Sequence, residues 1–126
     1  MTEEAARIDI DDPEVDMDDA QRLLYRGVPF TGEVSEYLAG ALVSLDIYAD
    51  GVPHGLCREW YRDGTPRSEG VVHRGLPRGE SREWHPDGRL SRRQVFDADG
   101  LTLREDDAWD ETGRLTRSWR GPTEET

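Results

Sequence analysis

A ten-residue stretch of this chain occurs twice in nearly the same form, and this recurrence limits the possible folds more than any other feature of the sequence. Residues 55–64 read Gly-Leu-Cys-Arg-Glu-Trp-Tyr-Arg-Asp-Gly, and residues 79–88 read Gly-Glu-Ser-Arg-Glu-Trp-His-Pro-Asp-Gly. More divergent copies occur at 32–40 and 108–113. Such self-similarity indicates that one small structural unit is stacked several times.

Three series of residues keep a common period. The aromatic series is Tyr37, Trp60, Trp84 and Trp109, at steps of 23, 24 and 25. The glycines that close the unit are Gly40, Gly64, Gly88 and Gly113, and a second glycine series is Gly27, Gly51, Gly75 and Gly100. Both glycine series advance by 24, 24 and 25, so they stay in phase with the aromatic residues.

Each period reads as two strands joined by a tight turn. Asp63-Gly64 and Asp87-Gly88 predict two-residue hairpin turns of type I′, where both central residues have positive φ. Looser connections between hairpins contain Pro53 and Pro77, which have no N–H to donate to a ladder. The predicted strands are 33–38, 41–48, 56–62, 65–73, 80–85, 89–97, 102–109 and 114–120.

Alternation along these strands assigns residues to the two faces of the sheet. The aromatic series lines one face, and a row of carboxylates lines the other, with members Glu36, Glu59 and Glu83. Two-residue turns also set the register. The residues then predicted to lie opposite one another are Trp60 and Arg67, Trp84 and Ser91, Glu59 and Ser68, and Glu83 and Arg92.

The chain before the repeats is strongly acidic. Residues 1–20 hold nine acidic residues and one Arg, in a chain of net charge −12. We expect residues 1–15 to be loose or lightly docked, because they show no periodicity. Residues 16–25 fit the start of a short helix or a lead-in strand around 23–25. The strand is preferred, because Tyr25-Arg26-Gly27 falls one period before Tyr48-Ala-Asp-Gly51.

These features predict an all-β fold: an elongated, twisted, single-layer antiparallel β-meander of about four β-hairpin repeats, with an acidic N-terminal segment. Only 34% of the residues are hydrophobic and 35% are charged, which leaves little material for a two-layer core. The predicted divisions are an acidic segment at 1–19, a repeat sheet at 20–120 and a tail at 121–126. Within the sheet the repeats fall near 28–51, 52–75, 76–100 and 101–120.

Charge and composition narrow the function classes. The acidic balance disfavours direct nucleic-acid binding, since phosphates require a basic face, and it favours a basic partner. An acidic tail that only solvates the chain stays an alternative. One Cys rules out a disulfide framework, and no apolar run could span a membrane. The acidic start is unlike a signal peptide, so we expect a cytoplasmic protein that does not bind membranes.

Residues capable of chemistry are present but form no recognisable catalytic pattern. The three histidines, at 54, 73 and 85, match no zinc-binding spacing. Cys57 occupies a position that holds Val34 and Ser81 in other repeats, so it reads as a small sheet residue rather than a nucleophile. We therefore expect no catalytic residue, no metal and no cofactor.

The carboxylate and aromatic rows each allow two interpretations. Carboxylates on alternate strands lie about 9–10 Å apart, a separation that suits an inverting glycosidase, but the repeat accounts for the row without a substrate. The aromatic row is either a ladder that joins the repeats or a set of partly exposed anchors for a partner. The candidate partner-binding residues are Asp16, Asp18, Asp19, Tyr37, Arg58, Glu59, Trp60, Arg82, Glu83, Trp84 and Trp109.

The repeated residues resemble a known family. Phe30-Thr-Gly-Glu-Val, the two Arg-Glu-Trp copies, the Asp-Gly pairs and Trp109-Asp-Glu-Thr-Gly are similar to the MORN-variant repeats of YwqK-type bacterial proteins, over roughly residues 25–119. The end repeats depart from the pattern, since Ala39-Gly40 replaces Asp-Gly and no Arg-Glu precedes Trp109. Worn end repeats of this kind are typical of repeat proteins.

The resemblance implies an antitoxin or immunity protein that neutralises a partner toxin. On this hypothesis the chain is not an enzyme, and a face of its sheet binds a toxin with a basic cleft. Two alternatives stay open. One is a protein–protein scaffold or assembly module, which an open edge strand would allow to form a homodimer. The other is a small enzyme that uses the Glu row.

Overall fold

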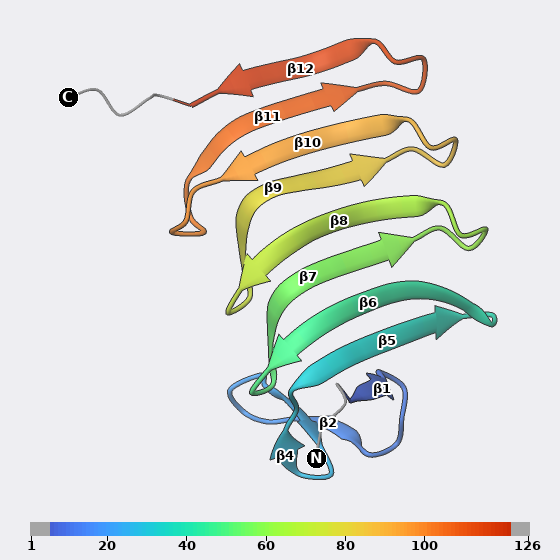
Figure 1. Cartoon of the computed structure of the whole chain (residues 1–126), viewed down its shortest axis with the longest axis vertical. Helices are drawn as coiled ribbons and strands as arrows, with labels where there is room; N and C mark the ends of the chain where they lie inside the picture. Colours follow the sequence, from blue (N-terminus) through green and yellow to red (C-terminus); the bar gives the residue numbers. More distant parts are fainter. Residues whose placement is uncertain (1–5, 122–126) are drawn as a thin grey trace, which may run out of the picture.

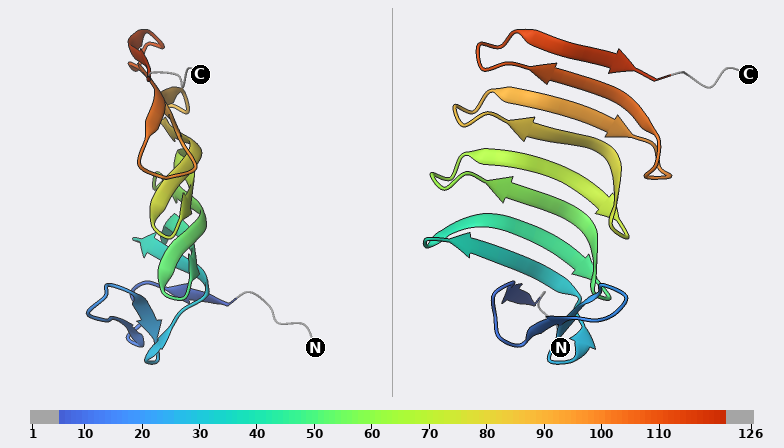
Figure 2. Two further views of the ribbon diagram at one scale, coloured as in Figure 1. Left: turned by 90° about the vertical axis from the view of Figure 1, so that its left-hand side faces the viewer. Right: turned by 180° about the vertical axis from the view of Figure 1, so that it is seen from behind.

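The computed structural model describes residues 6–121, and within them the chain is all β, without a helix. Eight long strands lie side by side in the order of the sequence (Figure 1). Seen from the edge, the sheet is a single twisted layer (Figure 2). The elongated hairpin architecture predicted from the 24-residue period is therefore present.

The strands of the repeats are β5 (Gly32–Leu38), β6 (Ala41–Ala49), β7 (Val52–Trp60), β8 (Pro66–His73), β9 (Leu76–Trp84), β10 (Leu90–Phe96), β11 (Leu103–Trp109) and β12 (Leu115–Arg120). Six of the eight repeat strands match the predicted ranges within one residue, whereas β7 and β9 each begin four residues before the predicted start. Short strands precede the repeats: β1 (Arg7–Asp9), β2 (Val15–Met17), β3 (Leu23–Tyr25) and β4 (Val28–Pro29). The lead-in strand preferred for residues 23–25 is thus confirmed as β3.

The main sheet is mixed rather than wholly antiparallel, so the prediction was wrong at one edge. Its strand order is β1-β5-β6-β7-β8-β9-β10-β11-β12, and β1 pairs with β5 in parallel. Ile8, in the middle of β1, lies opposite Val34 and is buried. A parallel strand of three residues leaves no periodic signal in the sequence, because its partner is far along the chain and no hairpin turn joins them.

The N-terminal segment forms a cap on the first repeat. Strands β2, β3 and β4 make a separate small sheet. The buried cluster of the cap comprises Ile8, Leu23, Phe30 and Val34, with Ile10, Val15, Tyr25 and Tyr48 packed against it. Residues 6–15 are therefore paired and packed rather than loose, which corrects that expectation for the described part of 1–15. Residues 1–5 lie outside the described part.

The Asp-Gly turns differ from the predicted type I′ geometry. At Asp63-Gly64 only Gly64 has positive φ, at 96°. The Gly64 N–H donates to the Tyr61 carbonyl at 3.0 Å, and the Tyr61 N–H donates to Thr65 at 2.9 Å, so the loop has three residues. Asp63 contributes through its carboxylate, which accepts the Thr65 N–H at 2.9 Å. This is a type I turn closed by a glycine, which needs one positive φ instead of two.

Two-residue turns with positive φ at both central residues occur at the other end of the strands, between hairpins, where looser connections were expected. Asp50 and Gly51 have φ of 52° and 83°, and Arg74 and Gly75 have 53° and 84°. The flanking residues pair directly, as Ala49 does with Val52. The first repeat also has such a turn, at Ala39-Gly40, at the end of the strands where the later repeats have Asp-Gly. Pro53 and Pro77 lie inside strands β7 and β9, at their second positions.

The turn geometry shifts the register beside each aromatic residue. The predicted pairs Glu59–Ser68 and Glu83–Arg92 are confirmed, but Trp60 lies opposite Pro66 and Trp84 opposite Leu90. The three-residue loop shifts the partner of each tryptophan by one residue relative to the predicted register. A bulge in the second strand of the hairpin restores the predicted register at the next pair. Arg67 and Ser91, predicted to face the tryptophans, are the extra residues of these bulges.

Candidate interaction faces

The sheet has two faces of different chemistry. One row of directly paired residues crosses all eight long strands, and we call the side that carries it the Glu face. Its members are Glu36, Ser44, Glu59, Ser68, Glu83, Arg92, Ala108 and Arg117. Directly paired residues share a face, so the three glutamates of the predicted row do lie on one side.

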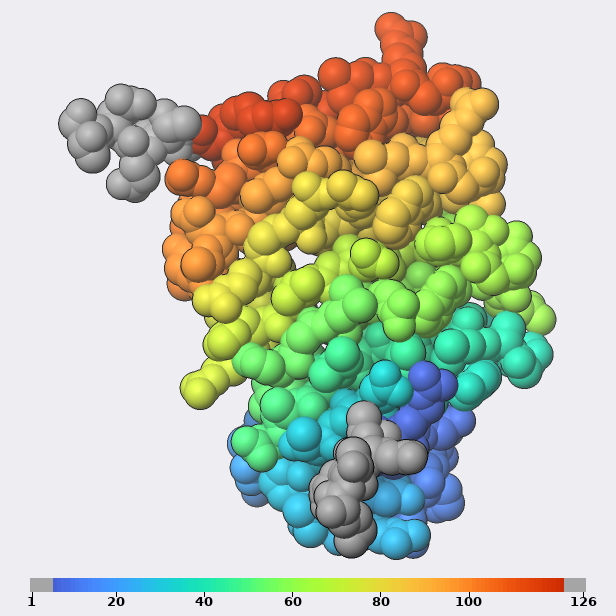
Figure 3. Space-filling model, viewed as in Figure 1, coloured from blue at the N-terminus to red at the C-terminus, as the bar shows by residue number. Residues whose placement is uncertain are grey.

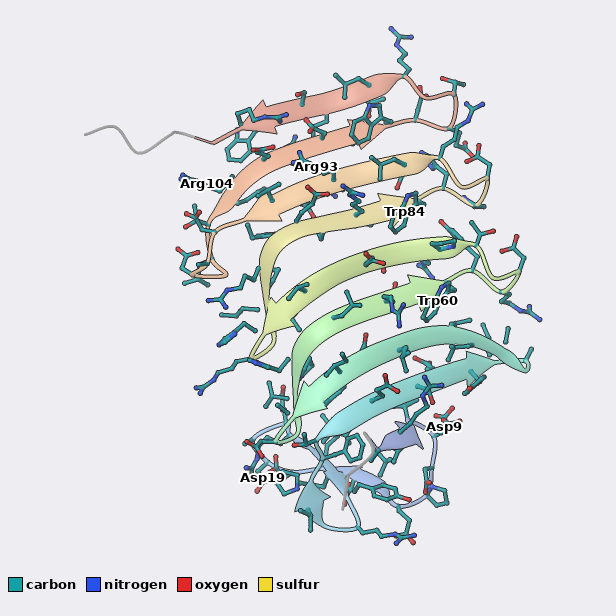
Figure 4. The ribbon with its side chains drawn as sticks, in the orientation of Figure 1. Asp9, Asp19, Trp60, Trp84, Arg93 and Arg104 are labelled. Carbon is teal, nitrogen blue, oxygen red and sulfur yellow. The ribbon has the colours of Figure 1, made fainter. Side chains whose placement is uncertain are left out.

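The opposite side carries the aromatic series and the arginines that precede it by two residues. We call this side the Arg-Trp face; its central row is Ser35, Leu45, Arg58, Glu69, Arg82, Arg93, Asp107 and Ser118. The Arg58 guanidinium carbon lies 5.4 Å from the centre of the Trp60 ring, which places both side chains together. Trp60 and Trp84 lie at equivalent ends of their strands (Figure 4).

The aromatic residues of the Arg-Trp face are neither fully buried nor fully free. Tyr37 is 42% exposed, whereas Trp60, Trp84 and Trp109 are half-buried. Two aliphatic side chains on the same face, toward the other end of the strands, are also open to solvent: Ile47 is 37% exposed and Val71 is 42% exposed. This face therefore offers apolar surface beside fixed guanidinium groups, a combination favoured at the energetic centres of protein interfaces.

The residue after each tryptophan joins neighbouring repeats. The Tyr61 hydroxyl donates to the Trp84 carbonyl at 2.6 Å, and His85 Nε2 lies 2.9 Å from the Trp109 carbonyl oxygen. His85 thus has the same structural place as Tyr61 one repeat earlier. This inter-repeat contact was missed in the sequence, although both residues follow the Arg-Glu-Trp motif directly.

The other two histidines, His54 and His73, lie together at the other end of the strands, near the start of β7 and the end of β8. The rings of His54 and His73 are 4.4 Å apart between centres. Partial removal from water, followed by the positive charge of Arg78, lowers the pKa of His73. Within residues 6–121 no group of three or more His, Cys, Asp or Glu side chains is arranged to hold a metal.

The Cys57 thiol sits in an unreactive environment. Burial, together with the charge of Asp46 opposite it, raises the pKa of Cys57 to about 12. A nucleophilic cysteine needs the reverse, a lowered pKa and a nearby base. Burial likewise raises the pKa of Asp46.

Ion pairs dominate the C-terminal half of the Arg-Trp face. Arg93 lies at the centre of a chain of charges on β10 (Figure 4), with Nε 3.1 Å from Glu80 and Nη1 2.8 Å from Glu105. Arg82 also pairs with Glu80, and Arg120 Nη1 lies 2.8 Å from Asp107. The carboxylates and guanidinium groups alternate from β9 to β12, so they hold strands together where apolar core is lacking.

A second ionic cluster lies on the Glu face. Asp106 is 1% exposed, and its carboxylate forms ion pairs with Arg92 from β10 and Arg117 from β12. The sequence holds a signal for the first of these clusters. Repeat four carries Asp107 where repeats two and three carry Arg58 and Arg82, so the sign of the charge at this position is reversed.

The acidic residues proposed to meet a partner lie in the cap. The Asp18 carboxylate accepts the N–H groups of Ala20 and Arg22 and pairs with the Arg22 side chain at 2.8 Å. The bond from the Arg22 amide is the main reason that the pKa of Asp18 is lowered. Asp16 accepts the Met17 N–H at 2.8 Å, and Asp19 is exposed.

The candidate partner-binding residues therefore fall into three places. Tyr37, Arg58, Trp60, Arg82, Trp84 and Trp109 lie on the Arg-Trp face; Glu59 and Glu83 lie on the Glu face; Asp16, Asp18 and Asp19 lie in the cap. A single rigid partner surface could not contact both faces of one sheet at once. A groove of about 400 Å³ crosses the first two repeats, and its lining includes Glu36, Leu38 and Glu59 together with Trp60.

No protein-family model, curated protein or solved structure matches the chain at a significant level. Residues 6–121 also contain no helix with the length and apolar character needed to cross a membrane.

Proposed function

We propose that this chain is a non-catalytic antitoxin or immunity protein that binds a cognate bacterial toxin through its Arg-Trp face. The observation that carries the proposal is that the Arg-Trp face of the single-layer sheet is uncovered by other elements of residues 6–121, and that Arg58 lies over Trp60 on this face. Tyr37, Ile47 and Val71 add solvent-exposed apolar surface on the same side. Such a surface can bury aromatic and aliphatic groups against a partner while its arginines set the register.

The remaining titratable groups support binding rather than catalysis. Cys57 has a raised pKa, His85 is bonded to a neighbouring repeat, and the carboxylates of β11 are occupied by arginines. These groups stabilise the sheet. The resemblance to MORN-variant repeats of YwqK-type proteins points to the same function, in the cytoplasm of a bacterium.

The charge of the chain indicates the chemistry of the toxin. The acidic cap and a net charge of −12 favour a partner with a basic cleft, as a toxin acting on nucleic acid or nucleotides would have. Long-range attraction of this kind speeds association and weakens with salt. Asp16 and Asp19 are the candidate steering groups of the cap, whereas Asp18 is held in its own turn.

Co-expression tests the proposal. The protein encoded beside this chain's gene is expressed alone and together with this chain in a heterologous bacterium. We expect growth arrest in the first case and restored growth in the second. A neighbour that is harmless alone, or toxicity that persists in the presence of this chain, would contradict the proposal.

A second candidate function, a scaffold or assembly module, is favoured by one observation. All six residues of β12 are exposed, and no strand of the described part of the chain pairs with its outer edge. An open strand edge is a template for pairing with another chain.

A further inference from the structure

The two edges of the main sheet are finished differently. At one edge β1 covers β5, where three residues pair in parallel. At the other edge β12 has a neighbour on one side only among residues 6–121, and it forms the upper rim of the molecule in Figure 3. Natural sheets usually protect such an edge with inward-pointing charges, proline, bulges or a covering segment.

The arginines of β12 leave its open edge unguarded. Arg117 Nε lies 2.9 Å from Asp106, and Arg120 Nη1 lies 2.8 Å from Asp107. Both guanidinium groups are therefore drawn back across the sheet onto β11, away from the open edge. β12 contains no acidic residue and no proline that would oppose the approach of a further strand, and its bulge, at Thr116, lies two residues before Ser118.

The backbone of β12 has its free hydrogen-bonding groups at a defined residue. The Gly121 N–H donates to the Arg104 carbonyl on β11 at 2.7 Å. In an antiparallel ladder, inward and outward amides alternate, so Trp119 also faces β11, whereas Ser118 and Arg120 face outward. Ser118 thus presents both its N–H and its C=O to an incoming strand.

We propose that two copies of this chain pair through β12 in an antiparallel two-fold dimer centred on Ser118. Ser118 of each copy then exchanges both backbone hydrogen bonds with Ser118 of the other. This register places Arg117 opposite Trp119 of the second copy, on the Glu face, where the aliphatic part of the Arg117 side chain can pack against the indole ring while the guanidinium stays on Asp106. Pairing centred on Arg117 would instead set two arginines opposite each other.

The dimer has a consequence for the shape of the assembly. Residues directly opposite in an antiparallel pair lie on the same side, so the two sheets continue into one another with the Arg-Trp faces on one side. A single continuous surface would then carry two sets of the aromatic series. The inference is independent of the proposed toxin, because it concerns the edge of the sheet and not its face.

Cysteine cross-linking tests the register. In a Cys57→Ser background, Ser118→Cys places two thiols on residues about 5.5 Å apart between Cα atoms, within the range of a disulfide. We expect mild oxidation to give a disulfide-linked dimer. Thr116→Cys in the same background is the control, because its opposite residue is Arg120 of the second copy. Equal cross-linking of the two variants, or none in Ser118→Cys, would overturn the proposal.

A proline variant tests pairing at the β12 edge without disulfide cross-linking. Ser118→Pro removes the outward N–H and the hydroxyl that donates to Asp107, but β12 keeps its backbone bonds to β11. Ser118→Ala loses the same hydroxyl and keeps the amide. Light scattering at high protein concentration should give twice the chain mass for wild type and Ser118→Ala and the single-chain mass for Ser118→Pro. A monomeric wild type, or an unchanged dimer in folded Ser118→Pro, would contradict it.

Discussion

Arg92 binds Asp106 through two hydrogen bonds, Nε to Oδ1 at 3.0 Å and Nη2 to Oδ2 at 2.9 Å. The two-point contact joins β10 to β11, and Arg117 adds a contact from β12 to the same carboxylate at 2.9 Å. A buried carboxylate that receives two guanidinium groups is fully paired, and the removal of one partner would leave charge without compensation.

Replacement of Asp106 should therefore destabilise the protein strongly. We expect Asp106→Ala to lower the free energy of unfolding by about 3 kcal/mol, because three charge-assisted hydrogen bonds from Arg92 and Arg117 are lost. Asp87→Asn is the control: the amide oxygen can still accept the Arg89 N–H, the ion pair that is lost is 3.7 Å long between side chains at least half exposed, and the expected change is below about 0.5 kcal/mol. Urea unfolding followed by circular dichroism measures both. Similar losses in the two variants would show that the buried cluster is not the stabilising element.

Acid should weaken the same region. The bonds from Arg92 lower the pKa of Asp106, and those from Arg120 and Ser118 lower the pKa of Asp107. A carboxyl with a lower pKa in the folded chain stabilises the fold above its unfolded pKa, near 3.8, and this contribution disappears as pH falls through the folded value.

The pH dependence of unfolding checks this sign. The free energy of unfolding should fall as pH decreases from about 5 to about 2, and Arg92→Ala should make that fall shallower. A slope unaffected by Arg92→Ala would mean that other carboxyls account for the acid sensitivity.

The cap should be sensitive at its contact with the Asp50-Gly51 turn. Gly51 has φ of 83°, and a Cβ there would lie 2.8 Å from the Leu23 carbonyl and 2.9 Å from Arg22 Cβ. Gly40 has nearly the same φ, 84°, with no atom within 4 Å of its Cβ position. The two glycines separate backbone strain from the steric contact with the cap.

Thermal unfolding of two alanine variants measures the difference. Gly40→Ala should cost about 1 kcal/mol, the strain of a positive φ, and Gly51→Ala about 3 kcal/mol, since overpacking against the cap adds to it. Equal costs would indicate that the cap does not dock on this turn.

Cys57 should be protected from modification while the protein is folded. With its pKa raised to about 12, the thiol contains very little thiolate near neutral pH. Ellman's reagent at about pH 8 should react more than about 100-fold more slowly with the native protein than with the urea-unfolded chain. Equal rates would place the thiol in an open, polar setting.

The repeat period predicted the long strands, because hairpins place partners close together in the chain. The turn type was wrong, because Asp-Gly suits both a type I′ turn and a type I turn closed by glycine, and the side chain of Asp63 favours the latter. β1 escaped detection because its partner lies 26 residues away, as Arg7 opposite Glu33 shows.

The Glu and aromatic rows followed from alternation within a strand. The ionic clusters did not, because Arg92, Asp106 and Arg117 meet across three strands. Their contact depends on the register beyond two bulges. The division of the candidate residues between two faces and the cap depends on the same register.

The most direct measurement of the central claim is a calorimetric titration of the neighbouring gene's product with this chain. Val71 is 42% exposed on the Arg-Trp face, and Leu38 is 55% exposed and lies beside the groove that contains Glu36 and Glu59 on the Glu face. We predict that wild type and Leu38→Arg bind with similar affinity, whereas Val71→Arg binds at least about 10-fold more weakly, a loss of about 1.4 kcal/mol. No binding by wild type, or equal binding by both variants, would contradict the claim that the Arg-Trp face holds the toxin.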